Sequence, residues 1–87
     1  MEKDTFDNLV QTERLRQDYK WVEQNHDPFI WLAILGEEYG ELQKAVLEKH
    51  FCELYPISQS EKVEVELIHV AAVAKAMYES GKRNGWL

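Results

Sequence analysis

Residues 67–77 read Leu67-Ile68-His69-Val70-Ala71-Ala72-Val73-Ala74-Lys75-Ala76-Met77 and are apolar nearly all round a helix. Such a helix has to be covered on more than one side, which two other helices of an 87-residue chain can hardly do. Its alanines would also let another helix approach closely. These residues predict an all-α protein with three helices per chain, in which dimerisation completes a four-helix-bundle core.

Local start and stop signals divide the chain, residues 1–87, into three helices of a single domain. The apolar stretch belongs to a helix over 59–80, which starts at a capping box formed by Ser58 and Glu61 and stops before Gly81. A helix over 28–51 starts at Asp27 and Pro28. The first helix covers 5–23, is capped by residue 4 or 5, and is expected to expose most of its polar residues at 13–18. Strand-type alternation is absent.

Composition excludes several kinds of partner. The net charge of −6 argues against a nucleic-acid polymer, because a phosphate backbone requires a basic face. The longest apolar run is too short to cross a membrane. The single cysteine, Cys52, fits a reducing compartment, and the charged segment Met1 to Asp7 does not resemble a signal peptide. We therefore expect a cytoplasmic protein.

Acidic residues gather on the second predicted helix at Glu37, Glu38 and Glu41, within about one turn. Glu66 and His69 lie three positions apart on the next helix. Clustered carboxylates beside an apolar core need a cation or raised pKa values, and hard oxygen ligands suit Mg²⁺ or Mn²⁺. The alternative is a solvated acidic patch next to a hydrogen-bonded core histidine.

The combined pattern resembles the MazG-like all-α nucleoside triphosphate pyrophosphohydrolases. That family carries E-E-x-x-E on one helix and E-x-x-D on the next; the chain has the first motif complete and E-x-x-H, with His69, in place of the second. Segments 13–21, 24–27 and 66–76 also resemble a small phage and bacterial MazG-like subgroup, so the resemblance covers most of the chain.

The resemblance implies hydrolysis of an NTP or dNTP to its monophosphate and pyrophosphate, with a role in nucleotide-pool housekeeping. It implies Mg²⁺, or Mn²⁺, as cofactor, with Glu37, Glu41 and Glu66 as first ligands. Glu38 is either a further ligand or the catalytic base that orients water. Imidazole is a poor ligand for Mg²⁺ but a good one for Mn²⁺, Fe or Zn²⁺. Either His69 lies outside the coordination sphere, or the metal preference is shifted, or turnover is weakened.

Residues around the second predicted helix are weaker predictions for substrate binding. They are Lys20, Trp21, Gln24, Asn25, His26 and Lys44. Trp21 could stack on a base, although tryptophan is more often a core or interface residue. Lys44 could reach a phosphate, or it could pair with Glu41 or Glu48. The basic tail 82–84 could assist phosphate binding or complement the dipole of the last helix.

Two other functions fit the same residues. Glu66-x-x-His69 is also the E-x-x-H element of di-iron carboxylate bundles, which would make an oxidative or iron-handling protein. A catalytically silent helical dimer could instead act as a regulator.

Overall fold

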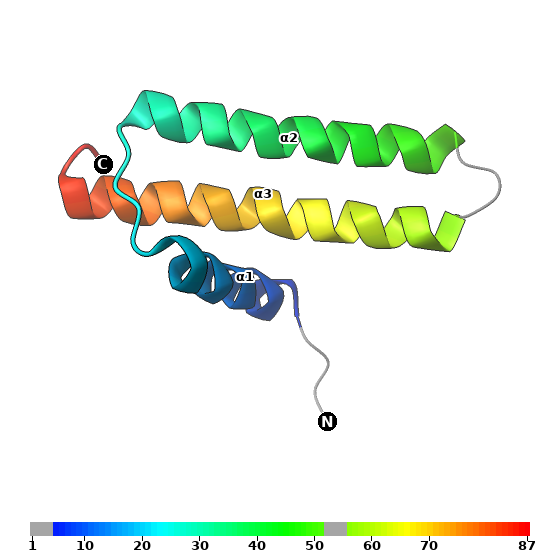
Figure 1. Cartoon of the computed structure of the whole chain (residues 1–87), viewed down its shortest axis with the longest axis horizontal. Coiled ribbons are helices and arrows are strands. Elements are labelled where there is room, and N and C mark those ends of the chain that lie inside the picture. The colour runs from blue at the N-terminus through cyan, green and yellow to red at the C-terminus, as the bar shows by residue number, and fades with distance from the viewer. Residues whose placement is uncertain (1–4, 52–55) are drawn as a thin grey trace.

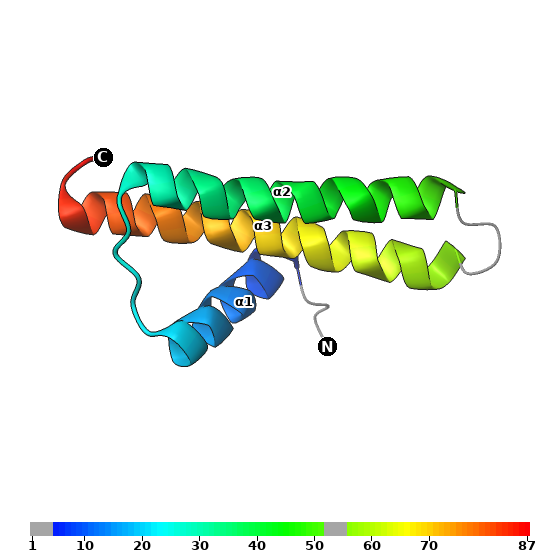
Figure 2. The same cartoon turned by 45° about the horizontal axis from the view of Figure 1, so that its top comes forward.

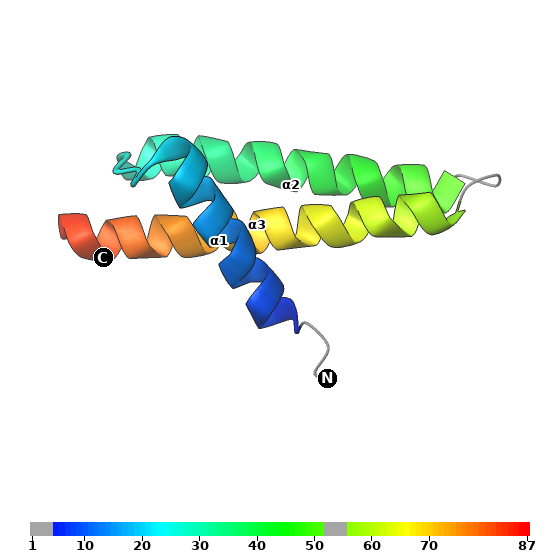
Figure 3. The same ribbon diagram turned by 60° about the horizontal axis from the view of Figure 1, so that its bottom comes forward.

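The computed structural model describes residues 5–51 and 56–87, with the backbone alone for 56–59. The described residues form three helices and contain no strand: α1 (Phe6–Trp21), α2 (Pro28–Phe51) and α3 (Pro56–Asn84). The long helices α2 and α3 run antiparallel, side by side (Figures 1 and 2). The shorter α1 crosses α3 obliquely and packs on it, as Figure 3 shows. The predicted all-α class is confirmed.

The first two helices begin where the local signals predict. Thr5 caps α1 because its Oγ1 accepts a hydrogen bond from the backbone N–H of Asn8 at 3.1 Å. Asp27 caps α2 in the same way, accepting from the N–H of Ile30 at 2.9 Å, with Pro28 at the first helical position. The predicted bounds of α2 are confirmed, and α1 ends two residues before its predicted end.

The predicted bounds of α3 are wrong at both ends. The helix begins at Pro56, so Ser58 lies inside it rather than capping it. It also passes through Gly81 and ends at Asn84, before Gly85, which has a φ of 81°. The N–H of Trp86 donates to the carbonyl of Gly81 at 3.1 Å, which is the Schellman arrangement. Gly85 is therefore the stop signal, and Gly81 makes room for Leu87, since a Cβ there would lie 2.6 Å from Leu87 Cδ1.

The apolar core lies between α2 and α3 and is small. Trp31, Val73 and Ala76 are its buried members. Partly buried residues pack against this centre: Ile34, Leu35, Met77 and Trp86. A core of this size supports the antiparallel helix pair, but it leaves much apolar surface uncovered.

Charged residues fill the contact between α1 and α3. Glu13 and Arg14 are buried there, so the expectation that residues 13–18 are mostly solvated is wrong for these two. Arg14 donates to Glu79 on α3 from Nε at 3.1 Å and from Nη2 at 3.0 Å, and it also pairs with Asp18 on α1. The docked side of α1 is therefore polar, with Val10 as its one buried apolar residue among those described.

The connection between α1 and α2 is held by the end of α3. Arg83 Nη2 donates to the carbonyl of Gln24 at 3.0 Å, and Asn84 Nδ2 donates to Asn25 Oδ1 at 2.9 Å. Arg83 also pairs with Glu23, with Nε 3.3 Å from the carboxylate. Part of the predicted basic tail thus fixes the course of residues 23–25.

The face of α2 turned away from α3 is exposed and largely apolar, although Gln43 and His50 also lie on it. Phe29, Leu32 and Leu47 are exposed, and Gly36 and Gly40 lie between them with open space around each. At 100° per residue, these five positions share a sector of about 80°. No helix in the described part of the chain is long and apolar enough to cross a bilayer.

Candidate metal centre

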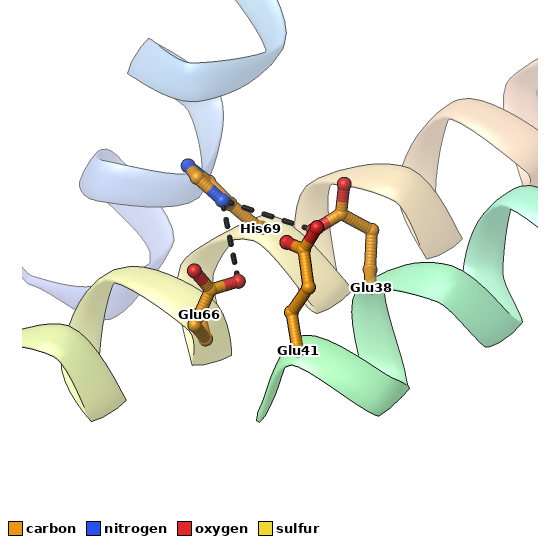
Figure 4. Close-up of side chains that lie close together, drawn as sticks. All are labelled: Glu38, Glu41, Glu66 and His69. Carbon is orange, nitrogen blue, oxygen red and sulfur yellow. Dashed lines mark ion pairs between the residues drawn. The ribbon is translucent and has the colours of Figure 1, made fainter. Parts of the chain in front are cut away.

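Four side chains from α2 and α3 converge midway along the helix pair. Glu38 and Glu41 come from α2, and Glu66 and His69 from α3, each pair three positions apart (Figure 4). Each offers a ligand atom, and these atoms all lie within 4.8 Å of one another. The spacing puts both members of a pair on one face of their helix, and the antiparallel packing turns the two faces toward each other.

The cluster contains carboxylate oxygens that accept no hydrogen bond. His69 Nδ1 lies 3.6 Å from Glu66 Oε2 and 3.8 Å from Glu38 Oε2. Both of these oxygens are buried and accept no hydrogen bond. Because a buried unpaired acceptor costs about 1–3 kcal/mol, and more when charged, these atoms favour a cation between them.

The arrangement fits a small divalent ion. Metal–oxygen bonds of about 2.0–2.2 Å place neighbouring ligand atoms about 3 Å apart and opposite ones about 4.2 Å apart. The observed ligand atoms all lie within 4.8 Å of one another, so they would move closer together on binding an ion. Glu41 is exposed, which leaves the cluster open to solvent on one side.

Burial is the main cause of raised pKa values in the cluster. It raises the pKa of Glu38, and the nearby Glu41 carboxylate raises it further. Burial also raises the pKa of Glu66, an effect that His69 partly opposes. Because burial disfavours the charged form of each carboxyl group, both groups favour a proton or a nearby cation.

These shifts predict the pH dependence of stability. Since the folded state holds the protons of Glu38 and Glu66 more tightly, the free energy of unfolding of the metal-free protein should fall as pH rises above 4.5, the ordinary value, through the raised pKa values. Thermal unfolding with a chelator between pH 4.5 and 7 measures this slope. The slope should be shallower in Glu38→Gln, and an equal slope in that variant would contradict the assignment.

Glu13 on α1 is a residue of this site that the sequence analysis missed. Its Oε2 lies 3.8 Å from His69 Nε2, on the opposite side of the ring from Nδ1. Arg16 donates to Glu13 from Nε at 2.8 Å and from Nη2 at 2.6 Å, and this pair lowers the pKa of Glu13. The spacing in the sequence could have indicated this position. Residues 13, 14 and 17 follow Val10 at intervals of three, four and seven, which places them on the same face of the helix as Val10.

The other predicted ligand, Glu37, stays outside this group. Its side chain is exposed, whereas Glu38 on the next position is half-buried against α3. The four residues brought together are therefore two of the three acids predicted on α2 and both residues predicted on α3.

An open pocket of about 170 Å³ adjoins the cluster and shares Glu38 and His69 with it. Its apolar wall comes from α2 and α3 and consists of Trp31, Ile34, Val73 and Ala76. Its remaining lining is mostly polar and comes from α1, the connection and the end of α3: Glu13, Arg14, Arg16, Gln17, Asp18, Trp21, Gln24 and Arg83. Two of the predicted substrate-binding residues, Trp21 and Gln24, therefore line a pocket beside the cluster.

The remaining predicted substrate-binding residues have other contacts. Lys20 lies over the ring of Trp21, with Nζ 4.7 Å from its centroid. Asn25 accepts from Arg83 and Asn84, and His26 packs edge-on against Trp31 at 5.0 Å between ring centroids. Lys44 is exposed, 3.9 Å from Glu48, as in one of the two predicted pairings. None of these four lines the pocket.

Comparison with known proteins adds no relative: no protein-family model, curated protein or solved structure matches the chain. Membership of the MazG-like family therefore stays a prediction from the motifs.

Proposed function

We propose that the protein is a metal-dependent hydrolase that cleaves an NTP or dNTP into its monophosphate and pyrophosphate. The observation that carries this proposal is the placement of three carboxylates and an imidazole, from two helices, beside a pocket with aromatic and arginine side chains. A triphosphate needs a cation before an acidic protein can hold it. Trp21, which lines the pocket and is 55% exposed, offers a flat surface to a base.

The residues take separate parts in this reaction. Glu38, Glu41, Glu66 and His69 would hold the ion, which when bound neutralises phosphate charge and lowers the pKa of a coordinated water. Glu38 also lines the pocket, and it would either complete this ligand set or accept a proton from the attacking water. Arg16 and Arg83 are the pocket's accessible arginines, with 55% and 35% of their side chains exposed, and a phosphate would compete for them with Glu13 and Glu23 respectively.

A panel of canonical and modified NTPs and dNTPs, with Mg²⁺ or Mn²⁺, tests the proposal through pyrophosphate release. Turnover should require the metal and should give monophosphate and pyrophosphate in equal amounts. A folded protein that releases pyrophosphate from no member of the panel, with either ion, would remove the enzyme proposal. In that case the silent regulatory dimer becomes the better description.

The proposal also includes association of the chain with a second copy of itself. The chain exposes 6694 Å², whereas a compact monomer of 10.3 kDa has about 5,400 Å² of accessible surface. The exposed apolar sector of α2, defined above by Phe29, Leu32, Gly36, Gly40 and Leu47, supplies a surface for a second helix pair. Packing of two such sectors would complete a four-helix bundle and bury part of this excess surface. We therefore propose a homodimer, or a tetramer built from it.

Leu47→Glu is expected to convert the dimer to a monomer, because it places a charge in the proposed apolar interface. Sedimentation velocity at micromolar concentration measures the change in mass. Leu15→Glu on α1 is a matched control, since Leu15 is 60% exposed and Leu47 57% exposed, and it should remain dimeric. A wild-type monomer at this concentration would contradict the proposal.

The iron alternative keeps one supporting observation, the position of His69 Nδ1 beside the carboxylates of Glu38 and Glu66. Imidazole and carboxylate ligands together also suit non-haem iron. Iron content and an oxygen-sensitive absorption band in anaerobically purified protein would favour this function over nucleotide hydrolysis.

A further inference from the structure

We infer that Glu13 is a positioning residue that turns His69 into a metal ligand and thereby makes the site prefer Mn²⁺, or a similar transition-metal ion, to Mg²⁺. This inference rests on the metal site of the proposed function. It concerns which ion the site selects and which side chain on α1 determines that choice.

The imidazole ring of His69 is flanked by carboxylates on both of its nitrogen atoms. Nε2 faces Glu13 on α1 at 3.8 Å, whereas Nδ1 faces Glu66 and Glu38 at 3.6 and 3.8 Å (Figure 4 shows the Nδ1 side). The two sides differ in what the carboxylates contact. Glu13 is already paired with Arg16 and Gln17, while Oε2 of Glu38 and of Glu66 has no hydrogen-bond partner.

This difference assigns the proton of the neutral ring when an ion is bound in the cluster. The bonds from Arg16 keep Glu13 ionised, and a carboxylate can only accept a hydrogen bond. In the metal-free protein carboxylates face both ring nitrogens, so either tautomer turns a lone pair toward one of them. An ion held by Glu38 and Glu66 would attract the lone pair of Nδ1 and leave the proton on Nε2, toward Glu13. Carboxylate–histidine–metal arrangements fix both the tautomer and the ring orientation, and Glu13 would close its 3.8 Å separation from Nε2 to accept this hydrogen bond.

The consequence is a choice of metal. Mg²⁺ takes oxygen ligands and strongly prefers a regular octahedron of them, whereas imidazole suits transition-metal ions. A transition-metal ion bound by Glu38, Glu41, Glu66 and Nδ1 of His69 would bind more tightly because of the nitrogen ligand, whereas Mg²⁺ would not. The histidine in the E-x-x-H motif is then the determinant of metal selectivity, and α1 takes part in the site without supplying a ligand.

Binding of Mn²⁺ and Mg²⁺ to the full-length chain, measured by calorimetry without nucleotide, tests the inference. The wild-type protein should bind Mn²⁺ more tightly than Mg²⁺. Glu13→Gln keeps the size of the side chain and should weaken Mn²⁺ binding by about 10-fold, the lower end of the range for residues that orient a ligand, and change Mg²⁺ binding less than about twofold. Glu64→Gln, the same substitution at an exposed position of α3, is the matched control and should change neither.

A second variant and a spectroscopic readout separate this role from a structural one. His69→Asp should reverse the preference in favour of Mg²⁺. With diamagnetic Zn²⁺ bound, the ¹⁵N chemical shifts of the His69 ring should report a proton on Nε2 in the wild-type protein and a smaller fraction of this tautomer in Glu13→Gln. Equal losses of Mn²⁺ and Mg²⁺ binding in Glu13→Gln, or an unchanged metal preference in His69→Asp, would overturn the inference.

The outcome is distinguishable from that of the proposed function. A chain that selects Mn²⁺ through His69 but releases no pyrophosphate would retain this inference and lose the enzyme proposal. A chain that hydrolyses nucleotides while binding Mg²⁺ as tightly as Mn²⁺ would do the reverse.

Discussion

Glu38→Gln is expected to lower the rate of pyrophosphate release at least about 100-fold, the smallest effect typical of losing a general base, without lowering the stability of the metal-free protein. Glutamine has the same shape but lacks the charge that holds the ion and accepts the proton. Its neutral amide also removes the cost of burying a charge and the repulsion from Glu41 and Glu66, which together raise the pKa of Glu38. We therefore expect the rate of pyrophosphate release to fall, while the stability of the metal-free protein rises or stays the same.

Steady-state kinetics and thermal unfolding with a chelator measure the two effects. Glu37→Gln provides the sharpest comparison, because Glu37 is the neighbouring acid on α2 but its side chain is exposed and outside the cluster. It should keep activity within about threefold of wild type, the range that a surface charge explains. If Glu37→Gln were the inactive variant and Glu38→Gln the active one, the ligand set derived from the structure would be incorrect.

Trp31→Ala is expected to reduce the free energy of unfolding by about 3–5 kcal/mol. Trp31 is only 3% exposed and is the largest buried member of the cluster that joins α2 to α3. Its removal would leave Val73 and Ala76 without their main partner on α2. Because small domains have about 5–15 kcal/mol in total, the loss would bring this chain close to unfolding at 25 °C.

Urea denaturation followed by circular dichroism measures this change at a fixed protein concentration, since association would itself add stability. Trp21→Ala is the control, because Trp21 is 55% exposed and lies outside this core. It should cost less than about 1 kcal/mol. A Trp31→Ala protein that is as stable as Trp21→Ala would show that the core lies elsewhere.

The sequence predicted those parts of the fold that depend on neighbouring residues. Asp27 and Pro28 act within one turn of α2, so its start could be read from the chain alone. Which glycine ends α3, Gly81 or Gly85, could not be read from the chain alone. It depends on whether Leu87 folds back onto the helix. Propensity treats both glycines alike, whereas packing distinguishes them.

The candidate site divides in a similar way. Helical spacing placed Glu66 and His69 on one face of α3, but it grouped Glu37 with Glu38 and Glu41 on α2, whereas the structure brings only Glu38 and Glu41 to the cluster. The decision requires knowing which sector of α2 faces α3. The place of Glu13 depends on how α1 docks, and a charged residue on a helix is usually solvated. Long-range packing therefore determined each of the residues that the sequence misassigned or missed.

The ligands of the cluster lie midway along two helices whose shared core is small. An ion held there would link α2 to α3, because it would bind side chains from both helices. It would also offset the repulsion between their carboxylates. At a free ion concentration 100 times its Kd, binding of the ion would add about 2.7 kcal/mol to the free energy of unfolding. The lifetime of the folded chain would then follow the supply of metal in its surroundings, so that starvation for the ion would remove the protein as well as its activity.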